Sequence, residues 1–238
     1  MPAPAIDLSH PGTAPTAWQP VVEALPLWQL QPQRHRRVVV VAPHPDDETL
    51  GVGGLIADAS SAGMDILVIS LTDGEAAFTE VGLGERRHHE LKAAMECLAP
   101  VAALTIERVG LPDGGLTDRH EQIAAAITDR LQRGDLVFAP LSCDGHPDHD
   151  AVGAVVESLV RDDIDVCFYP IWSWHWHQPS TSVIGVSGRR SVMSPAAAAA
   201  KAAALECYRS QTAGDDPILP DHFRGRFDSP FEVIVCRR

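Results

Sequence analysis

The chain of 238 residues has no apolar run that approaches the roughly 18–20 residues of a membrane-spanning helix. Its first residues lack the basic stretch and apolar core of a secretory signal, so we expect neither a membrane span nor export. Basic residues are scarce as well: 19 Lys and Arg stand against 32 Asp and Glu, which gives a formal net charge of −13. Such a chain is not expected to bind nucleic acid or an anionic membrane surface as its main partner.

Paired cysteines are also missing from the sequence. The five cysteines are scattered and include no Cys-x-x-Cys pair; they are Cys97, Cys143, Cys167, Cys207 and Cys236. An odd number without regular spacing does not resemble a disulfide framework. The pattern therefore favours a protein of the reducing cytoplasm.

From residue 37 onward, short β-branched runs alternate with segments of helical periodicity, without an internal repeat or a domain linker. The expected strands are 38–42, 66–71, 104–109, 136–139 and 166–169, and the expected helices are 48–61, 85–98, 118–132 and a segment after 150. Strands that alternate with helices of this length are joined by right-handed crossovers. The sequence therefore predicts an α/β fold with a mainly parallel sheet and helices on both faces.

The two ends of the chain are less regular. Residues 1–36 are rich in proline and are expected to form an N-terminal extension that packs on the main domain, residues 37–238. Residues 195–208 read as a helix, and 231–235 as a last strand that an edge position would suit. The alternating tryptophans of 172–176 would face one side of a strand, as core, cover or a platform for a sugar ring.

The first polar cluster follows the strand 38–42 directly. His44, Asp46, Asp47 and Glu48 lie on a turn that two prolines stiffen, at the edge of the sheet where open α/β folds bind ligands. An imidazole and three carboxylates are costly to hold together unless a cation shares them. A helix N-terminus that attracts acids would explain Glu48 and Asp47, but not His44 with both prolines.

A second cluster occupies the corresponding place after the strand 136–139. It contains Asp144, His146, Asp148, His149 and Asp150. Alone it could be a polar turn with capping aspartates, but the carboxyl ends of parallel strands share one edge, so the two clusters can converge. Imidazole and carboxylate ligands suit zinc, and three of them with one open position are typical of a catalytic zinc site.

These two motifs, Ala-Pro-His-Pro-Asp-Asp-Glu at 42–48 and Gly-His-Pro-Asp-His at 145–149, resemble those of the LmbE-like, or PIG-L, de-N-acetylases. Residues 72–75, Arg87-x-x-Glu90-Leu91, Asp113 and a helix ending in Ser210-Gln211, with Tyr208 where a histidine is frequent, add to the resemblance. It covers about residues 37–235 and implies a single Rossmann-like domain. It also implies zinc-dependent hydrolysis of an N-acyl group, usually acetyl on an amino sugar, so the expected partner is a small N-acetylated sugar or glycoconjugate.

Matched position by position, the resemblance assigns metal binding to His44, Asp47 and His149, the general base to Asp46 and oxyanion stabilisation by a protonated imidazole to His146. This assignment is chemically consistent, because zinc lowers the pKa of bound water towards ~7 and a neighbouring carboxylate can accept the proton. Other divalent metals fit the same ligands. From its adjacency alone, Asp148 is expected to orient a histidine from outside the ligand shell.

Other interpretations stay open at this point. Arg87 and Asp113 match positions that contact the substrate, yet both also fit an ordinary helix-surface arginine and a turn aspartate. The same catalytic residues would serve an amidase that cleaves sugar-linked thiol conjugates. A non-catalytic Rossmann-like module that binds a sugar or nucleotide is a third possibility. Against a nucleotide, Gly51-x-Gly53-Gly54 lies within the expected helix and is not the dinucleotide fingerprint.

Overall fold

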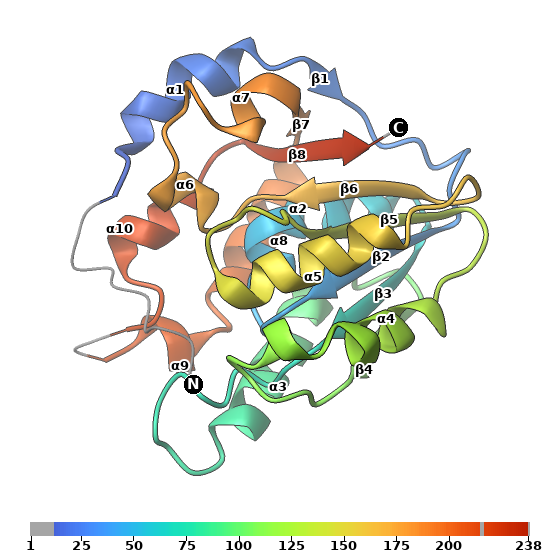
Figure 1. Cartoon of the computed structure of the whole chain (residues 1–238). Helices are drawn as coiled ribbons and strands as arrows, with labels where there is room; N and C mark the ends of the chain where they lie inside the picture. Colours follow the sequence, from blue (N-terminus) through green and yellow to red (C-terminus); the bar gives the residue numbers. More distant parts are fainter. Residues whose placement is uncertain (1–11, 215–216, 238) are drawn as a thin grey trace.

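The β-branched run after Arg37 forms strand β2, in which residues 38–42 are all buried in the interior of the sheet. A computed structural model describes residues 12–214 and 217–237 of the chain. The strands are β1 (Leu27–Trp28), β2 (Arg37–Ala42), β3 (Asp65–Ser70), β4 (Leu104–Arg108), β5 (Asp135–Pro140), β6 (Asp165–Tyr169), β7 (Gly188–Val192) and β8 (Phe231–Arg237). Within the described ranges they form one eight-stranded sheet in the order β1-β7-β8-β6-β5-β2-β3-β4 (Figure 1).

The order of the strands places the two polar clusters together. Strands β4, β3, β2, β5 and β6 run parallel, as the sequence predicted. The chain moves outward from β2 to β4 and then returns to place β5 beside β2. Such a reversal opens a crevice at the carboxyl ends of the two strands. The residues that follow β2 and those that follow β5 therefore meet at one edge of the sheet.

Helices cover both faces of the sheet, as predicted (Figure 1). The longer ones are α1 (Pro15–Ala24), α2 (Asp47–Ser61), α3 (Leu83–Leu98), α4 (His120–Thr128), α5 (Pro147–Ser158) and α8 (Pro195–Leu205). Alternate residues of β2 divide between two apolar cores: Val38 and Val40 face α2, α3 and α8, whereas Val39 and Val41 face α1, α4 and α5. In the described ranges no helix is both long and apolar enough to cross a bilayer.

The segment after β6 departs from the sequence prediction. Short helices α6 (Ser173–Trp176), α7 (Val183–Ser187), α9 (Arg209–Thr212) and α10 (Asp221–Arg224) lie in this part. The tryptophans of 172–176 thus do not alternate along a strand: Trp172 is buried, whereas Trp176 at the end of α6 is 38% exposed. The prediction of an edge position for the last strand is also wrong, because β8 pairs antiparallel with β6 on one side and β7 on the other.

The described part of the N-terminal segment packs against the rest of the chain. Trp18 of α1 is buried, and its indole N–H donates to the carbonyl oxygen of Trp174 at 3.0 Å. Strand β1 adds to the sheet by parallel pairing with β7. These contacts agree with an extension that packs on the domain, while the boundary between residues 36 and 37 stays a prediction.

One pair of cysteines contradicts the expectation that none is joined. Cys167 of β6 and Cys236 of β8 are direct partners across the antiparallel pair, and a disulfide connects them. The two residues are 69 positions apart in the sequence, so no local spacing indicates the bond. This bond does not support a reducing compartment, and the cellular location stays a prediction.

Candidate metal centre and active site

The edge of the sheet where β2 and β5 end contains a cluster of His44, Asp47 and His149. One ligand atom of each residue lies within 4.8 Å of the others. Asp47 is central: its Oδ2 is 3.2 Å from His44 Nδ1 and 3.2 Å from His149 Nε2. The structure therefore brings together the three residues that the sequence predicted as metal ligands, from motifs about a hundred positions apart.

Asp144 fixes the orientation of His149. Its carboxylate is fully buried and accepts a hydrogen bond of 2.8 Å from Nδ1 of His149. It also accepts the backbone N–H groups of Ile171, Trp172 and Ser173 at 2.9–3.0 Å and the Ser173 hydroxyl at 2.8 Å. With Nδ1 donating to this carboxylate, Nε2 of neutral His149 presents its lone pair to the cluster.

His44 is supported by two further carboxylates. Its Nε2 lies 3.1 Å from Asp113 Oδ1 and 3.3 Å from Asp148 Oδ2. These three residues form a second group with the geometry of a metal site. Both oxygens of Asp148, however, already accept backbone N–H groups, from Gly114 at 2.9 Å and Leu116 at 3.0 Å. The second group is therefore better suited to hold the His44 ring than to bind a second ion.

The carboxylates create a field that favours positive charge. Burial lowers the pKa of His149, but Asp47 and Asp144 outweigh it and raise the pKa to about 9. The pKa of His44 is also raised against its burial, by Asp113, Asp148 and Asp47. A divalent cation bound among these groups would be stabilised by the same carboxylates, and it would displace the protons of the two imidazoles that face it.

The cluster fits a metal ion on one further observation. Among the described residues, Nε2 of His149 makes no hydrogen bond of good geometry, although the side chain is fully buried and Asp47 Oδ2 lies 3.2 Å away. Buried polar atoms are nearly always satisfied, so this imidazole nitrogen beside a carboxylate is suited to bind a metal ion. Two imidazoles and one carboxylate form the donor set that divalent transition metals prefer.

Asp46 lies between two of the cluster residues in an unusual backbone conformation. Its φ of 139° is the only positive value among the non-glycine residues described. Burial and the charge of Asp47 raise its pKa well above the usual range, although Arg87 and His44 act in the opposite direction. A carboxyl group with a raised pKa beside a metal cluster has the property expected of a general base.

His146 faces the cluster from the second loop. Its ring centroid is 4.9 Å from that of His44 and 4.8 Å from that of His149. Burial, followed by the charges of His149 and His44, lowers its pKa to about 3. Because Nδ1 accepts the backbone N–H of Asp148 at 3.2 Å, the proton of the neutral ring resides on Nε2. These features favour a neutral donor over the protonated imidazole expected from the sequence.

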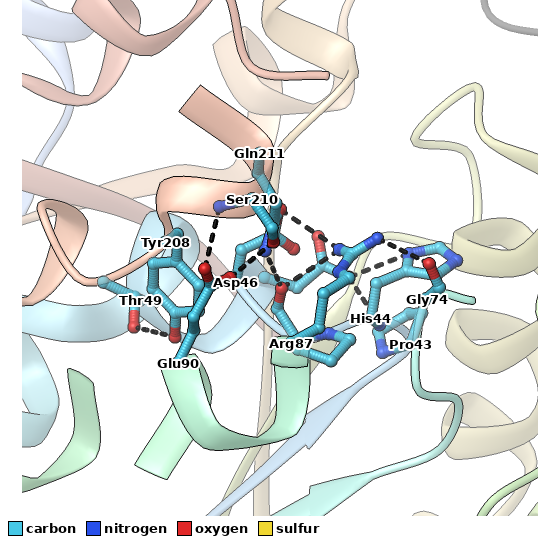
Figure 2. Close-up of polar contacts among 12 residues, drawn as sticks. Pro43, His44, Asp46, Thr49, Gly74, Arg87, Glu90, Tyr208, Ser210 and Gln211 are labelled. Carbon is cyan, nitrogen blue, oxygen red and sulfur yellow. Dashed lines mark hydrogen bonds and ion pairs between the residues drawn. The ribbon is translucent and has the colours of Figure 1, made fainter. Parts of the chain in front are cut away.

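Arg87 was expected to contact the substrate, but its guanidinium has protein partners. The residue is 3% exposed and donates to the carbonyl oxygens of Gly74 at 2.9 Å and Pro45 at 3.1 Å. Its Nη2 lies 3.8 Å from Asp46 Oδ2 (Figure 2). These contacts favour a role in holding the first motif over a direct contact with substrate.

Comparison with known proteins agrees with this geometry. The family model described as PIG-L, GlcNAc-PI de-N-acetylase, matches residues 39–160, just over half of the chain. The chain belongs to the PIG-L family. The matched range contains both motifs and every predicted site residue of this PIG-L domain.

Individual relatives cover the PIG-L domain to different extents. The diacetylchitobiose deacetylase of Thermococcus kodakarensis is 31% identical over 127 residues, 50% of this chain and 46% of the relative. A 1D-myo-inositol 2-acetamido-2-deoxy-alpha-D-glucopyranoside deacetylase of Corynebacterium glutamicum is 31% identical over 142 residues, 48% of this chain and 49% of the relative. The chain thus spans about half the length of these curated relatives. The crystal structure of a conserved protein of Thermus thermophilus is 31% identical with a TM-score of 0.59, covering 79% of this chain and 84% of that one.

The role of Asp144 and the partners of three predicted residues of the PIG-L site were not evident from the sequence. Asp144 was noted only as a neighbour of the second motif, although five hydrogen bonds converge on it. Its distance of five residues from His149 is a signal that could have identified it, since metal-binding histidines commonly donate to a carboxylate. Asp148 was expected to orient a histidine, and it contacts His44. The environments of Asp113 and Arg87 depend on contacts that no spacing reveals.

Proposed function

We propose that this chain is a metal-dependent hydrolase that removes an N-acetyl group from an amino sugar or its conjugate. The observation that supports the proposal best is the buried cluster of His44, Asp47 and His149, with Asp46 and His146 beside it, in a PIG-L domain. The two curated relatives named above are deacetylases of N-acetylated sugars by name, which agrees with such a substrate.

In this proposal His44, Asp47 and His149 hold the metal, and zinc is the preferred ion for their donor set. A divalent cation bound there supplies Lewis acidity, which polarises the amide carbonyl and lowers the pKa of a coordinated water. Asp144 keeps the Nδ1 proton of His149 in place. Asp148 and Asp113 hold the Nε2 proton of His44 in the same way, which leaves Nδ1 of this ring facing Asp47.

Asp46 accepts the proton of the attacking water. It lies directly before the proposed ligand Asp47 in the sequence, and a carboxylate in that place can both take the proton and return it to the departing amine. His146 lies beside the cluster, with its ring centroid 4.9 Å from that of His44, and donates its Nε2–H to the oxygen that becomes negative during attack. A neutral donor suffices for this role, since it needs only a hydrogen bond aimed at the developing charge.

A pair of substitutions tests these assignments. Asp46→Asn keeps the side-chain shape and tolerates a positive φ, but removes the base. We expect the turnover of an N-acetylglucosamine substrate to fall by about 10²–10⁴-fold while bound metal is retained. His149→Ala should lose both metal and activity. Free amine released from N-acetylglucosamine, diacetylchitobiose and an N-acetylglucosaminyl inositol, together with metal content by mass spectrometry, measures the two effects.

Asp58→Asn is the matched control, because Asp58 lies on the same helix and bonds the backbone of Ser194 away from the crevice. Its activity should stay within about twofold of the wild type. Full activity of Asp46→Asn would refute the catalytic assignment. A wild-type protein that binds no divalent metal and releases no amine would favour the non-catalytic binding module, and cleavage restricted to sugar-linked thiol conjugates would favour the amidase.

A further inference from the structure

The peptide group between Pro45 and Asp46 is held from both of its polar ends. The carbonyl oxygen of Pro45 accepts hydrogen bonds from Gln211 Nε2 at 2.7 Å and Arg87 Nη2 at 3.1 Å. The amide N–H of Asp46 donates to Glu48 Oε2 at 3.2 Å. Both donors to the carbonyl are buried, so water does not compete for this oxygen.

The orientation of this peptide plane determines φ of Asp46, because φ describes rotation about the bond between that amide nitrogen and Cα. A residue with a side chain rarely adopts a φ of 139°, and such a conformation costs about 1–3 kcal/mol. Without external restraint, rotation of the plane would relieve the cost and redirect the Asp46 side chain. The hydrogen bonds at both ends oppose that rotation.

Glu48 is in turn held by a hydroxyl pair. Its Oε1 accepts the phenol hydroxyl of Tyr208 and the hydroxyl of Thr49, the latter at 2.6 Å. All three side chains are fully buried. The second oxygen of Glu48 is thereby fixed in the position where it accepts the Asp46 N–H. Tyr208 therefore acts on Asp46 through Glu48.

The same C-terminal segment supplies the other restraint. Tyr208, Ser210 and Gln211 lie at the start of and within α9, and Ser210 binds Glu90 of α3 through its backbone N–H at 2.8 Å and its hydroxyl (Figure 2). This link joins α9 to the helix that carries Arg87. The Tyr208-x-Ser210-Gln211 stretch, which the catalytic assignments leave without a role, thus contacts the first motif at two points.

We propose that Tyr208 and Gln211 are positioning residues, which clamp the Pro45–Asp46 peptide and thereby keep the catalytic carboxylate of Asp46 aimed at the metal centre. The inference rests on the proposed function of Asp46. It adds that the strained conformation of this residue is imposed from a segment about 160 residues downstream.

The test compares Tyr208→Phe with Tyr169→Phe. Tyr169 is a matched control, since it is fully buried and donates its hydroxyl to a backbone oxygen, that of Val41 at 2.8 Å, and not to Glu48 or to the Pro45–Asp46 peptide. Both variants lose one buried hydrogen bond, so both should lose similar thermal stability. For Tyr208→Phe we expect kcat to fall about 10–100-fold at unchanged KM and metal content, the size of effect that misplacement of a catalytic group produces. For Tyr169→Phe kcat should not change.

Two further variants separate positioning from general destabilisation. Tyr208→His restores a donor to Glu48 and should recover most of the lost kcat. Gln211→Met removes the other restraint at similar volume, and the double variant should lose less than the product of the two single losses, because both act on one peptide. Equal kcat in Tyr208→Phe and Tyr169→Phe, or no recovery in Tyr208→His, would overturn the proposal.

A measurement without substrate makes the result independent of the proposed reaction. Hydrogen exchange at the Asp46 amide should accelerate at least tenfold in Tyr208→Phe and Gln211→Met, and stay unchanged in Tyr169→Phe. If the wild type has no deacetylase activity but the exchange pattern holds, the proposed function fails while the clamp stands. If exchange is the same in all variants, the clamp fails whatever the activity.

Discussion

The two loops that form the site are held in place by different means. The turn after β2, residues 43–48, is supported by side chains from α3 and α9 and contains the strained Asp46. The loop after β5, residues 144–149, is supported mainly by its own residues and by the segment that follows the adjacent strand β6, through Asp144. The turn after β2 thus depends on partners that are remote in the sequence, 42 and 166 positions away. The partners of Asp144 in the other loop are at most 29 positions away.

The difference separates two properties of the site. Asp144 acts on His149, a metal ligand, so the support of the second loop controls how well the metal is held. The remote supports of the first turn act on the Pro45–Asp46 peptide, so they control where the base lies. We therefore expect substitutions around the second loop to change metal affinity, and substitutions among the remote supports to change turnover at constant metal content.

The largest effect is expected for Asp144→Asn. The amide preserves the volume but loses the charge and turns one acceptor into a donor that faces backbone N–H groups. Metal affinity should fall about 10–100-fold, the usual result of removing a carboxylate behind a histidine ligand. Competition with a chelator measures the affinity. Asp135→Asn is the control: Asp135 is a buried aspartate at the other end of β5 that pairs with Arg37 at 2.7 Å. It should lose stability without a change in metal affinity, and equal losses of affinity would contradict the comparison.

Asp148→Asn should have a smaller effect on the same quantity, because Asp113 remains beside His44. Asp148 belongs to the second loop by sequence but supports a ligand of the first. We expect a loss of metal affinity near the lower limit of about tenfold. Asp150→Asn is the control, since the Asp150 carboxylate accepts the Gly145 N–H at 3.0 Å and does not belong to the pair of carboxylates that contacts Nε2 of His44. An unchanged affinity in Asp148→Asn would show that Asp113 alone orients His44.

The parts of the fold that follow from local sequence pattern were predictable. The β-branched runs and helical periodicities identified β2 to β6 and the helices between them, and the shared edge of parallel strands brought His44 and His149 together. The position of the last strand in the sheet could not be predicted, because its pairing with β6 and β7 depends on contacts between residues far apart in the sequence. The helical conformation of the tryptophan segment was not predictable, because period-two spacing over five residues does not exclude a helical turn.

Within the site, the sequence predicted residue types but not their partners. Motif spacing identified the metal cluster, since each ligand follows a strand end. The supports of Asp46 were not predictable, because they join residues 42–166 positions apart and reach backbone atoms, which carry no sequence signal. The positive φ of Asp46 could not be predicted either, because it depends on hydrogen bonds from distant residues that restrain both ends of the preceding peptide group.

Glu90→Gln tests a residue that contacts Asp46 only indirectly, through Ser210 and the helix α9. Glu90 of α3 accepts the backbone N–H and hydroxyl of Ser210, two bonds that hold α9 near the turn. Gln can keep one of these bonds but not the charge that strengthens both. We expect kcat to fall only about two- to fivefold, with metal affinity unchanged, because Gln211 and Tyr208 retain their own bonds. Glu96→Gln, an exposed carboxylate on the same helix, should leave kcat unchanged. A loss of metal in Glu90→Gln would remove the distinction between the loops.

The smallest effect on the site is expected from removal of the disulfide. Cys167 and Cys236 connect β6 to β8, and neither loop of the site contains them. Replacing both by alanine should lower the free energy of unfolding by about 2–4 kcal/mol, since the bond closes a long loop of the unfolded chain. Denaturant unfolding measures this loss. Metal affinity and kcat should stay within about twofold of the wild type, because Asp144 is held by the backbone of residues 171–173 beyond the end of β6. If metal affinity fell along with stability, the support of the second loop would extend through β6 to β8, and it would be as remote as that of the first.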